Sequence, residues 1–482
     1  MSPLDTYRAK RNAARTPEPV PAKERAPTKS RSGKKPAPTF VIQEHHASRL
    51  HWDFRLEKDG VLVSWAVPKG IPVDPKVNRL AVHVEDHPLE YAGFEGTIPK
   101  GEYGGGKVTL WDRGTYEVEK WSDREVMVVL HGERAQGRYV LFQTKGDQWM
   151  MHRMDPAPDD WEKMPELVKP MLASPGTMPT DSDRWAFEFK WDGARVVAYI
   201  DGGRVRLMSR NDLDVTVTYP ELHPLGLDLG SRPAILDGEV IALDDNGVPN
   251  FGVLQQRMHV NAATKARQLA ARVPVVYMVF DVLYLDGHSV IDKPYEHRRT
   301  LLEGLRLDGP SWKTPPSLRG DGEDFLEAAR SRGLEGVIAK RRDSAYIPGR
   351  RSPHWIKVKV IRAQEVVIGG WTPGTGRREH RIGALLLGIP DSDGLTYVGK
   401  VGTGFTDAML DALAATLKPL ATSASPFTAS PPKADASVAT WVRPKLVGEV
   451  EFTEWTSTGR LRHPTWRGLC PDKAPLEVVR ES

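Results

Sequence analysis

The nine residues from Phe187 to Arg195 constrain this chain more than any other stretch. They read FEFKWDGAR, in which apolar and polar residues alternate as in a β-strand and then meet a glycine turn, with Lys190 before it and Arg195 after it. Burial and neighbouring cations both disfavour the ammonium form of a lysine. The pattern therefore predicts a neutral Lys190 amine that attacks phosphorus and forms a lysine–AMP phosphoramidate. The alternative is a solvated lysine on a strand next to a turn.

Five more short motifs follow this segment in a fixed order. They are Ser209–Asn211 (SRN), Leu236–Glu239 (LDGE), Val279–Asp281 (VFD), Glu335–Lys340 (EGVIAK) and Trp355–Lys359 (WIKVK). Each alone is a weak signal, because motifs this short also occur by chance. Together with the K-x-D-G run at Lys190, the series resembles the motifs of the covalent nucleotidyltransferases, which comprise ATP-dependent DNA ligases, RNA ligases and mRNA capping enzymes.

The resemblance implies a role for each motif residue. Lys190 would be the catalytic nucleophile, with ATP as the cofactor and Mg²⁺ or Mn²⁺ as the assisting ion. Because cations must offset the charge of a triphosphate, the basic residues would contact its phosphates or ribose, and Phe280 would stack on adenine. Taken singly, each arginine or lysine is more often a solvated surface charge. The residues expected to bind the nucleotide are Glu188, Lys190, Arg195, Arg210, Glu239, Phe280, Glu335, Lys357 and Lys359, where Glu239 suits a ribose hydroxyl or a metal and Glu335 suits a metal.

Length and composition set the frame for these motifs. The 482 residues suggest roughly three domains. No run approaches the roughly 18 apolar residues that a membrane span needs, and the start of the chain lacks a secretory signal, so we expect a cytoplasmic protein. Cys470 is the only cysteine, which excludes an intrachain disulfide and fits a reducing compartment. The basic excess lies in residues 1–39, where ten Lys and Arg face three Asp and Glu, as in a tail that binds nucleic acid or in a solvated lead-in.

A polar constellation stands out in the β-rich region that follows this tail. His51, Asp53 and Arg55 are two residues apart, so on a strand all three would project from one face, and His45 lies just before them. Two imidazoles and a carboxylate suit a divalent transition metal, while Arg55 would hold a phosphate opposite it. A solvent-exposed polar face is the alternative. The apolar residues Leu50, Trp52 and Phe54 between them favour a row that faces a cleft.

This region resembles the 3′-phosphoesterase domain of bacterial ligase D, a multidomain end-joining DNA ligase. The resemblance rests on Gln43–Arg55, Trp65–Gly70, His87–Tyr91 and Phe94–Pro99. It implies that His45, His51 and Asp53 bind manganese. Arg55, His87 and Tyr91 would then contact the terminal phosphate as catalytic residues, with His87 as proton donor or transition-state stabiliser. The N-terminal element of that family carries over at Arg11 and Glu18, whereas Asn12 replaces an acid.

The same patterns predict a multidomain α+β protein. The strand-like and helical runs divide the chain into a basic flexible segment (1–39), a β-barrel domain (40–155), a linker (156–170), an α+β domain (171–360) and a C-terminal OB-fold barrel (361–482). The resemblances imply that the β-barrel is a 3′-phosphoesterase domain and that the α+β domain is a nucleotidyltransferase domain for adenylation.

The end of the chain departs from the family pattern. Arg460–Leu469 resembles the approach to motif VI of ligase D, which usually ends in an arginine followed by acids and a lysine. Here Cys470–Lys473 (CPDK) replaces the arginine and the first acid. We therefore expect a first adenylation step that is slow or that depends on Arg467.

These features predict a DNA repair enzyme with two activities: a 3′-end-healing phosphoesterase fused to an ATP-dependent DNA ligase, without the polymerase domain that many ligase D proteins carry. The expected setting is double-strand break repair by non-homologous end joining, on duplex DNA with nicks or ends, by a monomer associated with the bacterial nucleoid. A Ku-like end-binding protein is a candidate partner. An RNA-ligase-like nucleotidyltransferase shares the Lys190 motif, and a DNA-binding accessory protein with decayed catalysis fits the departures at Asn12 and Cys470.

Overall fold

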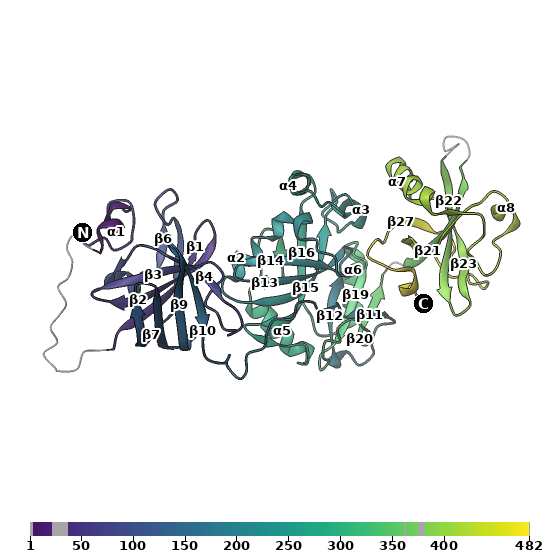
Figure 1. Cartoon of the computed structure of the whole chain (residues 1–482). Helices are drawn as coiled ribbons and strands as arrows, with labels where there is room; N and C mark the ends of the chain where they lie inside the picture. Colours follow the sequence, from purple (N-terminus) through teal and green to yellow (C-terminus); the bar gives the residue numbers. More distant parts are fainter. Residues whose placement is uncertain (1–2, 22–36, 361–362, 375–380, 482) are drawn as a thin grey trace.

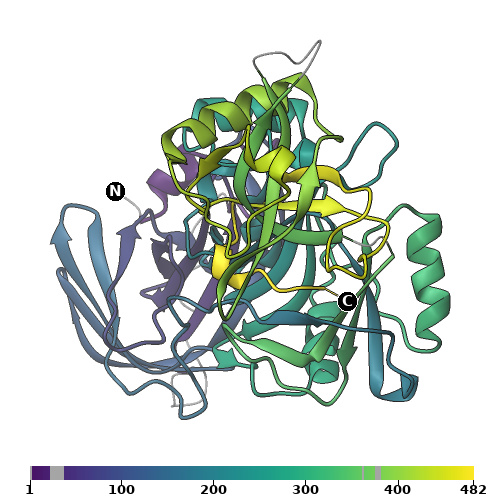
Figure 2. The same ribbon diagram turned by 90° about the vertical axis from the view of Figure 1, so that its right-hand side faces the viewer.

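The computed structural model describes residues 3–21, 37–360, 363–374 and 381–481. Figure 1 shows three bodies in a row: a β-barrel built from the first part of the chain, a central body of sheets and helices, and a smaller β-rich body formed by the last part. Figure 2 looks along this row from the side of the third body. The predicted fold classes of the three bodies are confirmed, while the residue limits assigned to them remain predictions.

The first body is a closed antiparallel barrel of eight strands, because the first strand pairs with both the second and the seventh. Phe40, Ile42, Trp52 and Phe54 pack into its core. The residues between them, including Asp53 and the others predicted to form the metal site, therefore lie on the opposite face. The barrel strands in spatial order are β1 (Thr39–His46), β2 (Leu50–Lys58), β3 (Val61–Val67), β4 (Arg79–His83), β10 (Gln148–Arg153), β9 (Gln136–Lys145), β8 (Glu125–Gly132) and β7 (Gly106–Ser122), with β5 (His87–Pro88) beside β3 and β6 (Gly96–Ile98) beside β7.

Residues 3–21 pack against the barrel, so the prediction that 1–39 is flexible is wrong for this part. Helix α1 (Asp5–Ala9) inserts the fully buried Tyr7 into a second cluster together with Val41, Leu62 and Tyr91. The Tyr7 hydroxyl donates a hydrogen bond to the carbonyl oxygen of Pro19 at 2.8 Å, which closes the segment on itself. Residues 1–2 and 22–36 of the predicted flexible segment lie outside the described residues.

The central body contains two sheets that meet at the nucleotide motifs. In the smaller one, Lys190 pairs with Gly336, and Gly336 pairs with Lys359, so three motifs line up across adjacent strands. A Cβ at Gly336 would lie 2.1 Å from the carbonyl oxygen of Val358, which explains the glycine after Glu335. The sheets comprise β11 (Leu172–Pro175), β20 (Arg351–Lys359), β19 (Gly336–Arg341) and β12 (Trp185–Lys190), and β14 (Arg204–Ser209), β13 (Ala194–Asp201), β15 (Ala234–Ala242), β16 (Val275–Leu285), β17 (His288–Ser289) and β18 (Trp312–Lys313).

Helices cover the central sheets and bury their outer faces. Phe325 and Ala329 of one helix pack on Phe187 and Phe189 of the lysine strand, and the rings of Phe189 and Phe325 stack with centroids 4.3 Å apart. This packing fixes the strand that carries Lys190. The helices are α2 (Leu225–Leu229), α3 (Phe251–Leu254), α4 (Ala263–Arg272), α5 (Tyr295–Gly304) and α6 (Gly322–Ser331).

The third body is the predicted OB-fold barrel. Its helix α7 (Asp407–Leu417) buries Leu410, Leu413 and Leu417 at helical spacing against the strands. The remaining elements are β21 (Ala363–Pro373), β22 (Ile382–Asp391), β23 (Gly394–Val401), β24 (Ala421–Thr422), α8 (Lys433–Ala436), β25 (Thr440–Val442), β26 (Val447–Glu451), β27 (Thr465–Leu469) and the 3₁₀ turn η7 (Pro475–Glu477). Within the described parts of the chain, no helix has both the length and the apolar character that crossing a membrane requires.

Two candidate active sites

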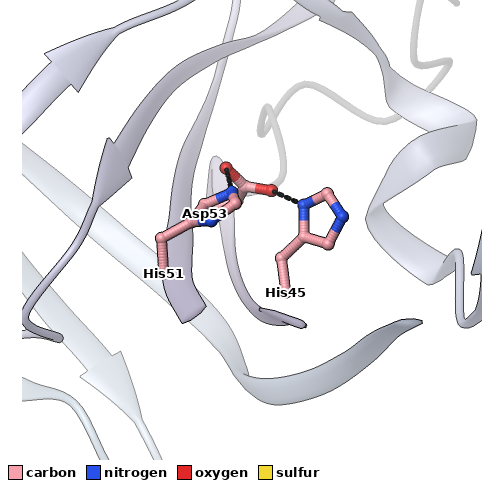
Figure 3. A group of neighbouring side chains, drawn as sticks. All are labelled: His45, His51 and Asp53. Carbon is pink, nitrogen blue, oxygen red and sulfur yellow. Dashed lines mark ion pairs between the residues drawn. The ribbon is translucent and has the colours of Figure 1, made fainter. Parts of the chain in front are cut away.

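His45, His51 and Asp53 form a compact cluster on the outer face of the barrel (Figure 3). His45 and His51 face each other across β1 and β2, and Asp53 lies next along β2. The Nδ1 atom of His45 is 3.4 Å from one carboxylate oxygen of Asp53, and the Nε2 atom of His51 is 3.6 Å from the other. The row predicted from the spacing therefore converges on one point.

The partners of the two imidazoles favour metal binding. The Nε2 of His45 lies 2.8 Å from the carbonyl oxygen of Gly104, and the Nδ1 of His51 lies 3.0 Å from that of Arg49. Because a carbonyl only accepts, each of these nitrogens carries the proton and donates it. The other nitrogen of each ring faces Asp53, as in protein metal sites whose histidines donate to an outer acceptor and coordinate through the second nitrogen. Two imidazoles and a carboxylate suit a divalent transition metal.

Arg55 contacts the cluster through Asp53 and is itself almost fully buried. Its guanidinium donates to Asp53 at 3.0 Å, to Gln43 at 2.9 Å and to Ser64 at 2.8 Å. Burial alone would raise the pKa of the Asp53 carboxyl, but Arg55, His45 and His51 together outweigh it and hold that pKa well below its usual range. Asp53 is therefore an anion, as a metal ligand must be.

The N-terminal segment closes over this site and brings in Arg11. The Arg11 guanidinium donates to Glu18 at 2.8 Å and to Glu85 at 3.0 Å, and lies 3.2 Å from the Nε2 of His87. The side chains of Arg11, Glu18 and Glu85 are each no more than 5% exposed. The Tyr91 hydroxyl donates to Glu18 at 3.2 Å. Arg11 and Glu18 thus link the segment to both predicted phosphate contacts.

His87 and Tyr91 are both held in neutral form. Burial, followed by the charges of Arg55 and Arg11, lowers the pKa of His87 well below its usual value, and its Nδ1 donates to the carbonyl oxygen of Glu85. Burial likewise raises the pKa of the Tyr91 hydroxyl. Both rings contact Tyr7, edge to face. A neutral His87 whose Nε2 faces cationic Arg11 can take up a proton only when an anion arrives beside it.

The second site is a pocket between the central body and the OB-fold barrel. All nine residues predicted to bind the nucleotide line it. The lining also includes Asp192, Glu449, Arg467, Cys470, Asp472 and Lys473, of which the last five come from the OB-fold barrel. Residues from six separate motifs therefore surround one cavity that also contains Lys190.

Lys190 is paired, which corrects the prediction of a neutral amine. Its Nζ atom donates to the Glu335 carboxylate, and both side chains are largely buried. Burial alone would lower the pKa of Lys190, but the carboxylate of Glu335 raises it above the usual value. Local sequence suggested aromatic neighbours and cations, whereas the fold brings an anion from 145 residues away. In this arrangement Lys190 is an ammonium group, so Glu335 must release it before it can attack.

The two lysines of the WIKVK motif meet other carboxylates. Lys359 lies 3.4 Å from Glu335, 3.1 Å from Glu449 and 3.1 Å from Glu481, and its pKa is raised because these anions outweigh its burial. Lys357 donates to Glu481. Burial and the neighbouring Lys359 lower the pKa of Lys357 to about 8. The pocket thus concentrates cations that burial destabilises and that an anionic ligand would stabilise.

Arg195 and Glu239 lie opposite each other on β13 and β15. The Arg195 guanidinium donates two hydrogen bonds to the Asp237 carboxylate, at 2.6 and 2.7 Å, and the Tyr346 hydroxyl donates to the same carboxylate at 2.6 Å. The bonds to Asp237 therefore fix the position of the Arg195 guanidinium in the pocket lining. Burial raises the pKa of Glu239 to about 8, although Arg195 and Lys190 oppose the rise. Glu239 is thus mostly protonated at neutral pH.

Phe280 forms an apolar wall at the far end of the pocket. Its ring meets the Trp355 ring edge to face, and the Lys340 ammonium lies 4.4 Å from the centroid of each. Glu188 accepts from Lys340 at 2.8 Å and from the Tyr295 hydroxyl. Glu188 therefore lines the pocket with its oxygens already paired to protein donors.

The OB-fold barrel completes the pocket through Arg467, Cys470 and the turn after them. Arg467 donates to Asp192 of the K-x-D-G motif at 2.8 Å, so it reaches the neighbourhood of Lys190 as expected. Burial and the carboxylate of Glu449 raise the pKa of the Cys470 thiol, which excludes a reactive thiolate. Arg210 lies 3.4 Å from Glu477 of η7.

Sequence reasoning missed four acids of the two sites. Asp192 belongs to the K-x-D-G motif and Glu85 lies two residues before the His87–Tyr91 run, so a charge argument could have found both. Glu449 and Glu481 lie 90 and more residues beyond the lysines they contact and have no motif of their own. Only the three-dimensional fold reveals them.

Comparison with known families assigns a description to each body. Residues 43–143 match the family model of the DNA ligase D 3′-phosphoesterase domain. Residues 165–359 match the ATP-dependent DNA ligase domain, and residues 378–473 match the ATP-dependent DNA ligase C-terminal region. The two sites therefore fall in segments of different families.

Relatives of similar build are found among bacterial proteins. The chain is 50% identical to the multifunctional non-homologous end joining protein LigD of Mycolicibacterium smegmatis over 490 residues, which cover 99% of this chain and 61% of that protein. The identity to the LigD of Pseudomonas aeruginosa is 39% over 536 residues, with 99% and 62% covered. The chain thus spans about three fifths of the length of these relatives. A solved structure, mycobacterial DNA ligase D with ATP and MES, matches 65% of this chain and 98% of its own at 46% identity, with a TM-score of 0.51.

Proposed function

Because this chain belongs to the DNA ligase D family, we propose that it seals breaks in DNA with ATP and heals 3′ ends before sealing them. The observation that carries the proposal is the convergence of six separate motifs on one pocket around Lys190. The setting would be non-homologous end joining, as printed in the names of the relatives. The substrate would be duplex DNA with nicks or ends.

The ligase reaction would begin at Lys190. Its Nζ atom attacks the α-phosphate of ATP, pyrophosphate leaves, and a phosphoramidate between lysine and AMP forms. AMP then moves to the 5′-phosphate of a break, and the 3′-hydroxyl displaces it. Arg195, Lys357 and Lys359 would offset the phosphate charge, and Phe280 would stack on adenine.

Glu335 controls when Lys190 can react. It holds Lys190 as an ammonium group. A divalent cation bound to this carboxylate would remove the ion pair and lower the pKa of Lys190, so that the ammonium group would lose its proton to solvent and become the attacking amine. The hard oxygen ligands of Glu335 suit Mg²⁺ or Mn²⁺, and such an ion would offset the charge of the phosphates when bound. The roles of the chain itself are to hold the proton on Lys190 at rest and to release it on loading.

The barrel would remove 3′-phosphate or 3′-ribonucleotide blocks. His45, His51 and Asp53 would hold a divalent transition metal, with Mn²⁺ the proposed ion, because their donor set and proton positions suit it. Arg55, Arg11, His87 and Tyr91 would bind and orient the terminal phosphate. The two activities are coupled chemically, since a ligase cannot use a blocked 3′ end.

The wider setting follows from this activity. We infer that the chain works as a monomer beside the bacterial nucleoid in the cytoplasm, because that is where broken chromosomal DNA is found. A Ku-like end-binding protein would be the partner that brings it to ends.

Labelled ATP tests the ligase half. Wild type incubated with ATP labelled at the α-phosphate should form a covalent adenylate, and Lys190→Ala should form none. Lys265→Ala, an exposed lysine of α4, is the matched control and should label normally. Absence of adenylate in wild type would leave only a DNA-binding role. Sealing of nicked DNA, compared with nicked RNA, separates DNA ligase from RNA ligase.

A nicked duplex with a 3′-phosphate tests the barrel. His51→Ala should abolish phosphate release in Mn²⁺ while adenylation continues, because the two sites use different residues. His131→Ala, an exposed histidine of the same barrel, should retain both activities. Loss of both activities in His51→Ala, or of neither, would contradict two independent sites.

A further inference from the structure

The lysines at the phosphate end of the nucleotide pocket already hold an anion from the protein itself. One carboxylate oxygen of Glu481 accepts from Lys357, and the other lies 3.1 Å from Lys359. Glu481 is only 6% exposed, so little water screens these contacts. The proposed function assigns the same two lysines to the phosphates of ATP.

The three carboxylates around Lys359 come from different kinds of secondary structure. Glu335 directly precedes β19, and Glu449 lies within β26, so the sheets fix both of them. Glu481 follows η7 in a stretch without regular structure. Of these three acids, Glu481 is the one that neither lies in a strand nor directly adjoins one.

A few hydrogen bonds attach this stretch to the OB-fold barrel. The backbone N–H of Glu481 donates to Gln364 at 2.8 Å, and the same Gln364 side chain donates to the carbonyl oxygen of Val479 at 2.9 Å. The Trp455 indole donates to the carbonyl oxygen of Glu481 at 2.9 Å. Figure 1 shows this last, yellow part of the chain on the side of the OB-fold body that faces the central body. The segment is therefore attached to the OB-fold barrel, and its Glu481 carboxylate contacts two lysines of the central body that line the pocket.

We propose that the Glu481 carboxylate is a stand-in for a nucleotide phosphate and that ATP displaces it from Lys357 and Lys359. Two adjacent buried ammonium groups repel each other, and a carboxylate between them offsets that repulsion when no nucleotide is bound. Phosphate oxygens offer the same lysines a charged acceptor of the same kind, with more negative charge. Glu481 and the triphosphate would then compete for one position.

Competition of this kind has a defined effect on ATP. If Glu481 occupies the lysines about nine-tenths of the time, only about a tenth of the molecules are free to accept phosphate, and the apparent affinity falls about tenfold. Glu481→Gln keeps the shape and the backbone bonds but removes the charge. The variant should need about five- to tenfold less ATP for half-maximal adenylation, with a similar maximal rate.

A purely structural role for Glu481 predicts the opposite sign. If the carboxylate served to hold the lysines ready for phosphate, Glu481→Gln would need more ATP, and Glu481→Asp would restore the wild-type value. Under competition, Glu481→Asp retains the charge on a shorter arm and should fall between wild type and Glu481→Gln.

The test measures single-turnover adenylation of the full chain against ATP concentration at saturating Mg²⁺, after pyrophosphate has removed any bound AMP. Glu454→Gln is the matched control, since Glu454 is a glutamate of the same barrel that pairs with Arg462 on the surface. A lower ATP requirement in Glu481→Gln alone supports the inference, and an equal or higher one overturns it. This inference rests on the proposed function: adenylate formation with an unchanged ATP requirement overturns only the role of Glu481, whereas no adenylate in wild type overturns both.

Discussion

Replacement of Arg11 by methionine should separate the N-terminal segment from the barrel. Arg11 offsets the charges of Glu18 and Glu85 and contacts His87, and its own side chain is 5% exposed. Methionine fills similar space without a charge, so the two carboxylates would lose this partner in a place that water hardly reaches. Lys10 still lies 2.9 Å from Glu85, whereas the side-chain donors that Glu18 keeps among the described residues, Thr16 and Tyr91, are neutral.

The size of the effect follows from this burial. Removal of one member of a buried ion pair costs about 3–5 kcal/mol, because the remaining charge stays desolvated. Residues 3–21 pack on a barrel that is already closed, so the cheapest response is detachment of the segment, which rehydrates Glu18. At about 1.4 kcal/mol per factor of ten, the docking equilibrium would shift by about 10²- to 4 × 10³-fold. His87 would then lose a cationic neighbour and part of its burial, and its pKa would move up toward the usual value.

Three measurements check this chain of reasoning. Hydrogen exchange of residues 3–21 should accelerate in Arg11→Met, release of 3′-phosphate should fall by about 10² or more, and adenylation should not change. Arg15→Met is the matched control, since Arg15 is 71% exposed and lies 3.7 Å from Glu102. A segment that stays protected in Arg11→Met, or phosphate release at the wild-type rate, would refute the argument.

Two further variants test the electrostatics of the central body. Because the pKa of Glu239 is raised from 4.5 to about 8, the folded state keeps a proton that the unfolded chain loses, and wild-type stability falls as the pH rises through that window. The full pKa shift corresponds to about 5 kcal/mol, and water in the open pocket reduces this free energy to about 2–3 kcal/mol. In urea unfolding, the stability of Glu239→Gln relative to wild type should therefore rise by about 2–3 kcal/mol between pH 5 and pH 9. A stability difference that is the same at both pH values would contradict this. Arg298→Met leaves the Asp281 carboxylate without its partner where both side chains are 0% exposed. The variant should lose about 3–5 kcal/mol of unfolding free energy, and its melting temperature should fall by about 10 °C. Arg462→Met, at the exposed pair with Glu454, should lose less than about 1 kcal/mol. Equal losses of unfolding free energy in the two arginine variants would contradict the view that burial makes the Arg298–Asp281 pair costly to break.

The order of the motifs predicted the nucleotide pocket, but it could not predict the charge state of Lys190. Alternation along 187–190 specifies a strand, and the strand fixes where the lysine lies. The charge on its amine depends on Glu335, which reaches Lys190 only because β12 pairs with β19. Local sequence contains no trace of that pairing, so the environment inferred from neighbours in the chain was wrong.

The VFD motif shows the same limit at a second place. Phe280 lines the pocket, as its motif suggested. Asp281, the next residue, points to the other side of β16 and is held by two bonds from Arg298 of α5. Neighbouring residues of a strand face opposite sides of the sheet. A role assigned to the motif as a whole does not separate the two directions. One half of the motif lines the pocket, and the other contacts a helix.

Composition misled for residues 3–21 for a different reason. Five helical residues give no measurable periodicity, and the prolines after them suggest a flexible chain. Order comes instead from burial of Tyr7 and from the carboxylates that receive Arg11, which are tertiary contacts. The family resemblance identified Arg11 and Glu18 one by one, but the residues alone gave no reason for a folded segment.

The two sites are closed by segments of opposite charge, and this difference predicts opposite responses. The N-terminal segment presents Arg11 to the site that would receive a terminal phosphate, so it would add to phosphate binding there. The last segment presents Glu481 to the lysines that would receive ATP, so it would compete. Removal of the first charge should therefore weaken the first activity, and removal of the second should lower the ATP requirement of the other. Loss of adenylation in the Glu481 variant would show that its segment acts by packing, and phosphate release at the wild-type rate in the Arg11 variant would show that the charge of Arg11 does not matter.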